Sequence, residues 1–103
     1  MAASKRKPKE TSIEKHFCDE FAIEFPEAEI RKFEARMHDM DRILFLPGGV
    51  TILVELKRPK ATLRAGQERA AKRFRDLGFE VYWAATKAAA DELIMLLVKK
   101  YRK

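Results

Sequence analysis

The stretch from Asp41 to Lys57, DRILFLPGGVTILVELK, constrains the fold of this chain more than any other. Two runs rich in Ile, Leu, Val and Phe flank Pro47-Gly48-Gly49. A short Gly-rich segment between two such runs is typical of the turn of a β-hairpin. A three-residue loop places Leu46 opposite Val50, so that the numbers of all opposed residues have the same sum.

In that register Asp41 lies directly opposite Glu55, with the two Cβ atoms roughly 5 Å apart. Because side chains alternate between faces, Lys57 lies on the same face as Glu55. Burying these charges is costly unless something compensates, and a bound divalent cation would do so. A two-residue Gly48-Gly49 loop would instead pair Asp41 with Leu56 and turn the acids apart. The spacing also fits an ordinary surface pair of Glu55 and Lys57.

Length and composition favour one folded domain with a highly charged surface. The 103 residues are enough for a single core. The one cysteine, Cys18, cannot form an internal disulfide, so a reducing cytoplasm is the expected compartment. We expect no signal peptide, and the apolar run Leu93 to Val98 is too short to cross a bilayer. The net charge of +6 favours a polyanionic partner, most simply nucleic acid.

The N-terminal part predicts a flexible basic arm followed by a helix. Residues 1–10 form the arm, which either contacts phosphates or only aids solubility, and residues 11–103 form the domain. Ile13, Phe17 and Phe21 recur at helical spacing, which predicts an amphipathic helix to about Ile23. Glu14 either caps this helix in a capping box or reaches toward the hairpin site.

Strands and helices alternate through the rest of the chain. A short strand is expected over Ile30 to Arg36, and the hairpin strands are apolar on both faces, as in a sheet covered on each side. A helix is expected from Leu63 to about Leu77, with Gly78 as its C′ residue. On its apolar stripe Gln67 is either a rim residue bonded to a backbone carbonyl or a functional one.

The C-terminal part predicts a fourth strand and a last helix. The strand spans Phe79 to Ala84, with Trp83 in the core or at an interface. Thr86 caps a helix to about Lys100 that is apolar around more than half its circumference, and we expect it to form a homodimer contact. The order is α-β-β-β-α-β-α, an α/β fold with a mixed four-stranded sheet flanked by helices. A right-handed crossover would lay Gln67 against the sheet face near the acids.

These residues in this order resemble the PD-(D/E)XK nuclease superfamily, and more closely the VRR-NUC domain in its short stand-alone form from bacteriophages and bacteria. The matching segments are Asp41-Arg42-Ile43-Leu44 with Pro47-Gly48-Gly49, Val54-Glu55-Leu56-Lys57 with Pro59, Leu63, Gln67, and Leu77-Gly78-Phe79-Glu80-Val81, together with Ile13-Glu14 and Lys32-Phe33. The likeness spans about Ser12 to Trp83. It implies a restriction-endonuclease-like core and a divalent-metal-dependent nuclease.

The resemblance assigns roles to individual residues. Asp41 and Glu55 would bind Mg²⁺ or Mn²⁺, with help from the Leu56 carbonyl and from Glu14, since hard cations take oxygen ligands. Lys57 would orient the attacking water or stabilise the developing charge, and Gln67 would hold Lys57 or the water. The expected DNA contacts are basic residues along the chain: Lys32, Arg42, Arg58, Lys60, Arg69, Lys72 and Arg73.

One departure from the family pattern concerns the residues before the aspartate. The family usually has Gly-x-Pro-Asp there, whereas this chain has His38-Asp39-Met40-Asp41. Asp39 shares a strand face with Asp41 and is a candidate extra ligand. His16 and His38 are isolated, and no Cys/His cluster predicts zinc.

The preferred function is a homodimeric, metal-dependent DNA endonuclease that cuts branched DNA such as four-way (Holliday) junctions. Two sites related by a twofold axis suit symmetric cuts. A nuclease for flaps or single-stranded ends, and a basic DNA-binding module without catalysis, are the alternatives. A binding module has no need of carboxylates that repel phosphate, which argues against the last.

Overall fold

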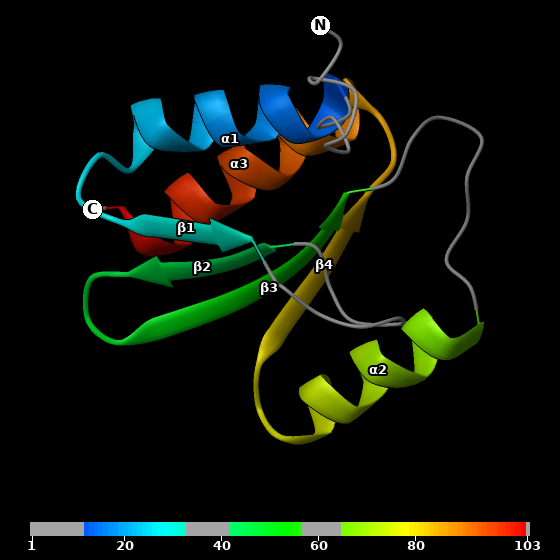
Figure 1. Cartoon of the computed structure of the whole chain (residues 1–103). Helices are drawn as coiled ribbons and strands as arrows, with labels where there is room; N and C mark the ends of the chain where they lie inside the picture. The colour runs from blue at the N-terminus through cyan, green and yellow to red at the C-terminus, as the bar shows by residue number, and fades with distance from the viewer. Residues whose placement is uncertain (1–11, 33–41, 57–64, 103) are drawn as a thin grey trace, which may run out of the picture.

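The computed structural model describes residues 12–32, 42–56 and 65–102, without the side chains of residues 65–67. Three helices and four strands follow one another in the order expected from the sequence (Figure 1). Their bounds are α1 Ser12–Glu24, β1 Glu29–Lys32, β2 Arg42–Leu46, β3 Val50–Leu56, α2 Ala65–Asp76, β4 Glu80–Ala84 and α3 Lys87–Tyr101. The predicted first strand continued to Arg36, but its last four positions lie outside the described residues.

The four strands form one mixed sheet in the order β1-β2-β3-β4. The pairs β1–β2 and β2–β3 are antiparallel, whereas β3 and β4 are parallel. A parallel neighbour requires a crossover, and the chain makes it through α2. The predicted α/β fold with a mixed sheet is confirmed.

The hairpin has the three-residue loop predicted from its sequence. Leu46 is opposite Val50, and the register continues in step to Arg42 opposite Val54. Gly48 and Gly49 have φ values of +89° and +80°, in the left-handed region that favours glycine. The two-residue alternative, which shifts the register by one residue, is therefore excluded for the described part of the hairpin.

Helices cover both faces of the sheet, as expected from strands that are apolar on both sides (Figure 1). On one face α1 and α3 lie side by side, and their Phe17, Phe21 and Leu97 belong to the larger core cluster with Leu44 and Ile52. The face covered by α2 has a smaller cluster: buried Leu53, Ala71 and Val81, with partly buried Ile43 and Phe74. Even-numbered hairpin residues thus face α1 and α3, whereas odd-numbered ones face α2.

The helix ends follow the signals in the sequence. Gly78 has a φ of +102° directly after α2, and its N–H donates to the Arg75 carbonyl at 2.9 Å. The Phe79 N–H donates to the Phe74 carbonyl at 3.0 Å, which completes a Schellman motif. Thr86 caps α3 by accepting a hydrogen bond from the Ala89 N–H at 3.0 Å. Within the described residues, none of the helices has the length and apolar character needed to cross a membrane.

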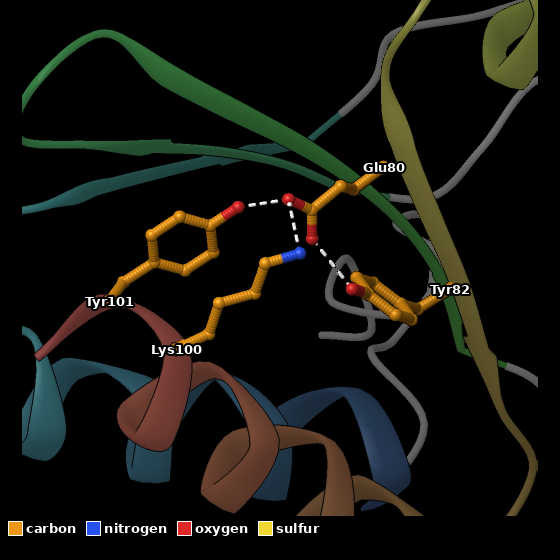
Figure 2. A network of polar contacts seen from close by, with 4 residues as sticks. All are labelled: Glu80, Tyr82, Lys100 and Tyr101. Carbon is orange, nitrogen blue, oxygen red and sulfur yellow. Dashed lines mark hydrogen bonds and ion pairs between the residues drawn. The ribbon is translucent and has the colours of Figure 1, made fainter.

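A network of hydrogen bonds connects the C-terminal end of α3 to the start of β4 (Figure 2). The Glu80 carboxylate accepts hydrogen bonds from the hydroxyls of Tyr82, at 2.6 Å, and Tyr101, and from the Lys100 ammonium at 3.1 Å. Burial raises the pKa of Glu80, but the hydrogen bonds from Tyr101, Tyr82 and Lys100 outweigh it and hold the pKa below its ordinary 4.5. The network therefore stabilises the fold through the ionised carboxylate.

Replacing Glu80 with Gln should lower the free energy of unfolding at about pH 7 by about 1–3 kcal/mol, as for hydrogen bonds to a charged group. Because the folded pKa lies below 4.5, the carboxylate's contribution is present above that pH and is lost as the pH falls through the folded pKa. In urea unfolding, the difference in the free energy of unfolding between wild type and E80Q should shrink as the pH is lowered toward about 3. Glu92→Gln, at an exposed position of α3, is the control. A difference between wild type and E80Q that grows in acid would contradict the role of the ionised Glu80.

Candidate functional site

Glu55 lies near the end of β3, on the face of the sheet that α2 covers. Leu53, two residues earlier on the same face, packs with Val81 and Ala71 in the smaller core cluster. Glu55 is only 1% exposed, and Arg42 at 3% is the other buried charged side chain of the described residues. A carboxylate at this depth is costly unless cations or hydrogen bonds compensate it, and Glu55 does have interaction partners.

Trp83 is the neighbour of Glu55 on the adjacent strand. The parallel register pairs Glu55 with Trp83 and Leu53 with Val81, so all four side chains share one face. Trp83 is 42% exposed and belongs to neither core cluster. Of the two positions expected for Trp83, the core is therefore excluded, because the strand turns the side chain toward solvent, whereas an interface position stays a prediction.

Two predicted site residues, Asp41 and Lys57, lie outside the described residues. The described register reaches the pair Arg42 and Val54, which immediately precedes the predicted pair of Asp41 and Glu55. That pairing, and the position of Lys57, remain predictions, as does a ligand role for Asp39. Leu56, whose carbonyl was expected to help bind the metal, is the last residue of β3.

Gln67 and Glu14 come from helices on opposite faces of the sheet. Gln67 is in the first turn of α2, one turn before the core residue Ala71, so its backbone lies in the layer over the face of Glu55. Glu14 is in the first turn of α1, whose helix covers the other face. The structure thus places Glu14 at the start of α1 without bringing it to the same face as Glu55.

The predicted DNA contacts divide into exposed, buried and undescribed residues. On α2, Arg69, Lys72 and Arg73 are exposed, and so is Lys32 at the end of β1. Arg42 is buried on the face that α1 and α3 cover, since it pairs with the core residue Val54. A side chain buried in this way does not fit a phosphate contact at the surface, so we no longer count Arg42 among the predicted DNA contacts. The remaining two, Arg58 and Lys60, lie outside the described residues.

The donor set fits a hard divalent cation in its chemistry. Carboxylate and backbone carbonyl oxygens are what Mg²⁺ and Mn²⁺ prefer, and one or two carboxylates suffice when waters and phosphate complete the shell. Among residues 12–32, 42–56 and 65–102, no group of three or more His, Cys, Asp or Glu side chains is arranged to hold a metal. Of the predicted ligands, Glu14, Glu55 and Leu56 are among the described residues and Asp41 is not, so the ligand set as a whole stays a prediction.

His16 lies on the face of the sheet opposite Glu55. His16 on α1 contacts the Asp91 carboxylate on α3 with 2.6 Å between nitrogen and oxygen, which joins the two helices on the far face. His38 lies outside the described residues.

Two features were missed from the sequence. The exposure of Trp83 depends on where α2 stops covering the sheet, which periodicity does not reveal. The network around Glu80 joins residues 21 positions apart in sequence, and the alternation of Glu80 and Tyr82 was its only local signal.

The comparison with solved structures gives a close structural match. A structure described as "VRR_NUC domain" superimposes with a TM-score of 0.69 at 25% sequence identity, covering 86% of this chain and 92% of that chain. No protein-family model matches the sequence, and the search of curated proteins gives no significant match. The resemblance inferred from the motif is thus supported by the fold as a whole.

The continuation of the hairpin register can be tested by disulfide trapping. In a Cys18→Ala background, the pair Asp41→Cys and Glu55→Cys should form an intramolecular disulfide on mild oxidation, because opposed residues bring their Cα atoms within the required roughly 4.4–6.8 Å. The matched pair Asp41→Cys and Leu56→Cys, which represents the slipped register, should not. Mass spectrometry under non-reducing conditions distinguishes the two, and cross-linking of only the second pair would overturn the register.

Proposed function

We propose that this chain, which is similar to a VRR-NUC domain in fold and in motif, is a divalent-metal-dependent DNA endonuclease that hydrolyses phosphodiester bonds. The observation that carries the proposal is the burial of Glu55 at the end of β3, on the face of α2. A carboxylate there, beside a strand end and below a basic helix, has the chemistry of a metal ligand rather than of a phosphate contact.

Each residue of the proposed site has its own role in catalysis. Glu55, Asp41 and the Leu56 carbonyl would hold Mg²⁺ or Mn²⁺. Glu14, which begins α1 on the other face of the sheet, would have to reach the ion past the sheet's end, directly or through a water. The bound ion supplies Lewis acidity and a more acidic water. Lys57 would orient the attacking water and help to take its proton, or would balance the negative charge that develops at the phosphorus. Gln67, from the first turn of α2, positions Lys57 or the water.

Basic residues on α2 supply the affinity for the DNA backbone. Arg69, Lys72 and Arg73 are exposed on the helix that covers the face of Glu55. Lys72 forms an ion pair with Asp76 at 2.8 Å, but both side chains are more than half exposed, and such pairs contribute little. Exchange of that partner for a phosphate therefore costs little, and released counterions favour binding.

The exposed side of α3 supports the homodimer. Met95 is 60% and Leu96 45% exposed, and with Val98 and Lys99 they line a hollow of about 520 Å³. Two copies related by a twofold axis would cover this apolar surface and present two sites to a symmetric substrate. We therefore retain branched DNA such as a Holliday junction as the preferred substrate.

Cleavage of labelled junction, flap, duplex and single-stranded DNA tests the activity. Wild type should cut branched DNA with Mg²⁺ or Mn²⁺ and not with chelator. Glu55→Ala should abolish cutting through loss of the metal, and Lys57→Ala should lower the rate by roughly 100- to 1,000-fold, as for removal of one group that stabilises developing charge. Glu92→Ala, an exposed carboxylate on α3, is the matched control and should cut normally.

Normal cutting by both Glu55→Ala and Lys57→Ala would show that the active site lies elsewhere. Tight binding of junctions by wild type, with no cutting under any metal, would favour the non-catalytic module.

Light scattering tests the dimer. The double variant Met95→Glu, Leu96→Glu should halve the molecular mass of the wild type, because the contact would bring four carboxylates together. Leu77→Glu is the control, since Leu77 is 73% exposed at the end of α2 on the other face of the sheet. A wild-type mass of one chain would contradict the dimer.

A further inference from the structure

We propose that Trp83 is a stacking platform for an unpaired nucleobase next to the phosphate that is cut. The inference rests on the proposed function and narrows its substrate to DNA with an unstacked base at the site. Trp83 is 42% exposed, although an indole ring is a large apolar surface that a small domain has reason to bury. Its neighbours along β4, Val81 and Ala84, are 5% and 1% exposed, so the strand itself is well covered.

The position of Trp83 beside Glu55 is what gives its exposure a role. The two residues are partners in the parallel register and share the face that α2 covers. Neighbouring strands lie about 4.8 Å apart, so the backbones of Trp83 and Glu55 are within the span of one nucleotide of each other. A phosphate held near Glu55 would bring the base of that nucleotide, or of the next, over the indole.

The helix over the face of Trp83 exposes basic residues that complement a nucleic acid strand. Arg75 donates a hydrogen bond from Nη2 to the Val81 carbonyl at 2.9 Å, which ties α2 to β4 two residues before Trp83. The same helix exposes Arg69, Lys72 and Arg73. Basic residues that follow a backbone, together with an aromatic ring for the bases, are the elements of a single-strand binding groove.

The platform discriminates between substrates because a paired base inside a duplex is already stacked on both sides. A base that is unpaired in a flap, a single-stranded end or an open branch point offers a free face to the indole. The protein should therefore bind such DNA more tightly than a continuous duplex of the same length and charge.

Trp83 is the only tryptophan of the chain, so its intrinsic fluorescence reports on the platform directly. With EDTA present to prevent cutting, a single-stranded oligonucleotide and a flapped duplex should quench the fluorescence of the full-length protein on binding, whereas a long blunt duplex should not. Trp83→Ala should weaken binding of the flapped duplex about 5- to 100-fold by anisotropy, the range of stacking on one base. Trp83→Phe should retain most of the affinity, which shows that the fold is intact.

Phe45→Ala is the matched control. Phe45 is 43% exposed and shares the face of Trp83, but its β3 partner Thr51 lies four residues before Glu55, roughly 13 Å along the strand. Equal binding of flapped DNA by Trp83→Ala and Phe45→Ala, or binding without quenching, would overturn the platform. Cleavage by the wild type is a separate measurement that tests the proposed function. If the wild type cuts flapped DNA but Trp83→Ala binds it normally, the protein is a nuclease and the platform is wrong. If DNA quenches the fluorescence but is never cut, the platform is right and the nuclease function is wrong.

Discussion

The three-residue turn at Pro47-Gly48-Gly49 decides which side of the sheet each hairpin residue occupies. With Leu46 opposite Val50, Glu55 shares the face of α2. A slip of one residue would exchange the faces and drive Glu55 into the core beneath α1 and α3. Both glycines of the turn have positive φ values, so the turn that sets the register depends on residues that adopt that backbone without strain.

The two faces of the sheet differ in the residues they bury. Under α1 and α3 lies the larger core, where Phe17 is fully buried and stacks on Phe21 at 5.9 Å between ring centroids. Among the described residues, the core cluster on the face of α2 has three buried members, Leu53, Ala71 and Val81, and beyond Leu53 and Val81 along their strands come a buried carboxylate and an exposed tryptophan. Among the described residues the larger apolar core thus lies under α1 and α3, and the face of α2 holds the carboxylate that is costly to bury.

Much of the fold was predictable because its signals are local. The turn glycines gave the register, the spacing of Ile13, Phe17 and Phe21 gave the first helix, and Gly78 marked the end of α2. The site residues stay a prediction, and of them the structure shows Glu55 buried on the face of α2. The burial of Arg42 and the exposure of Trp83 were not predictable, since both depend on which part of each face a distant helix covers.

The central claim is that Glu55 and its partner across the hairpin bind one divalent cation. Anomalous scattering from a crystal soaked in Mn²⁺ tests it directly. The account predicts a peak roughly 2 Å from a Glu55 carboxylate oxygen and from Asp41 on the opposed strand. Density that shows Asp41 and Glu55 on opposite sides of the sheet, with Mn²⁺ bound elsewhere or nowhere, would contradict it.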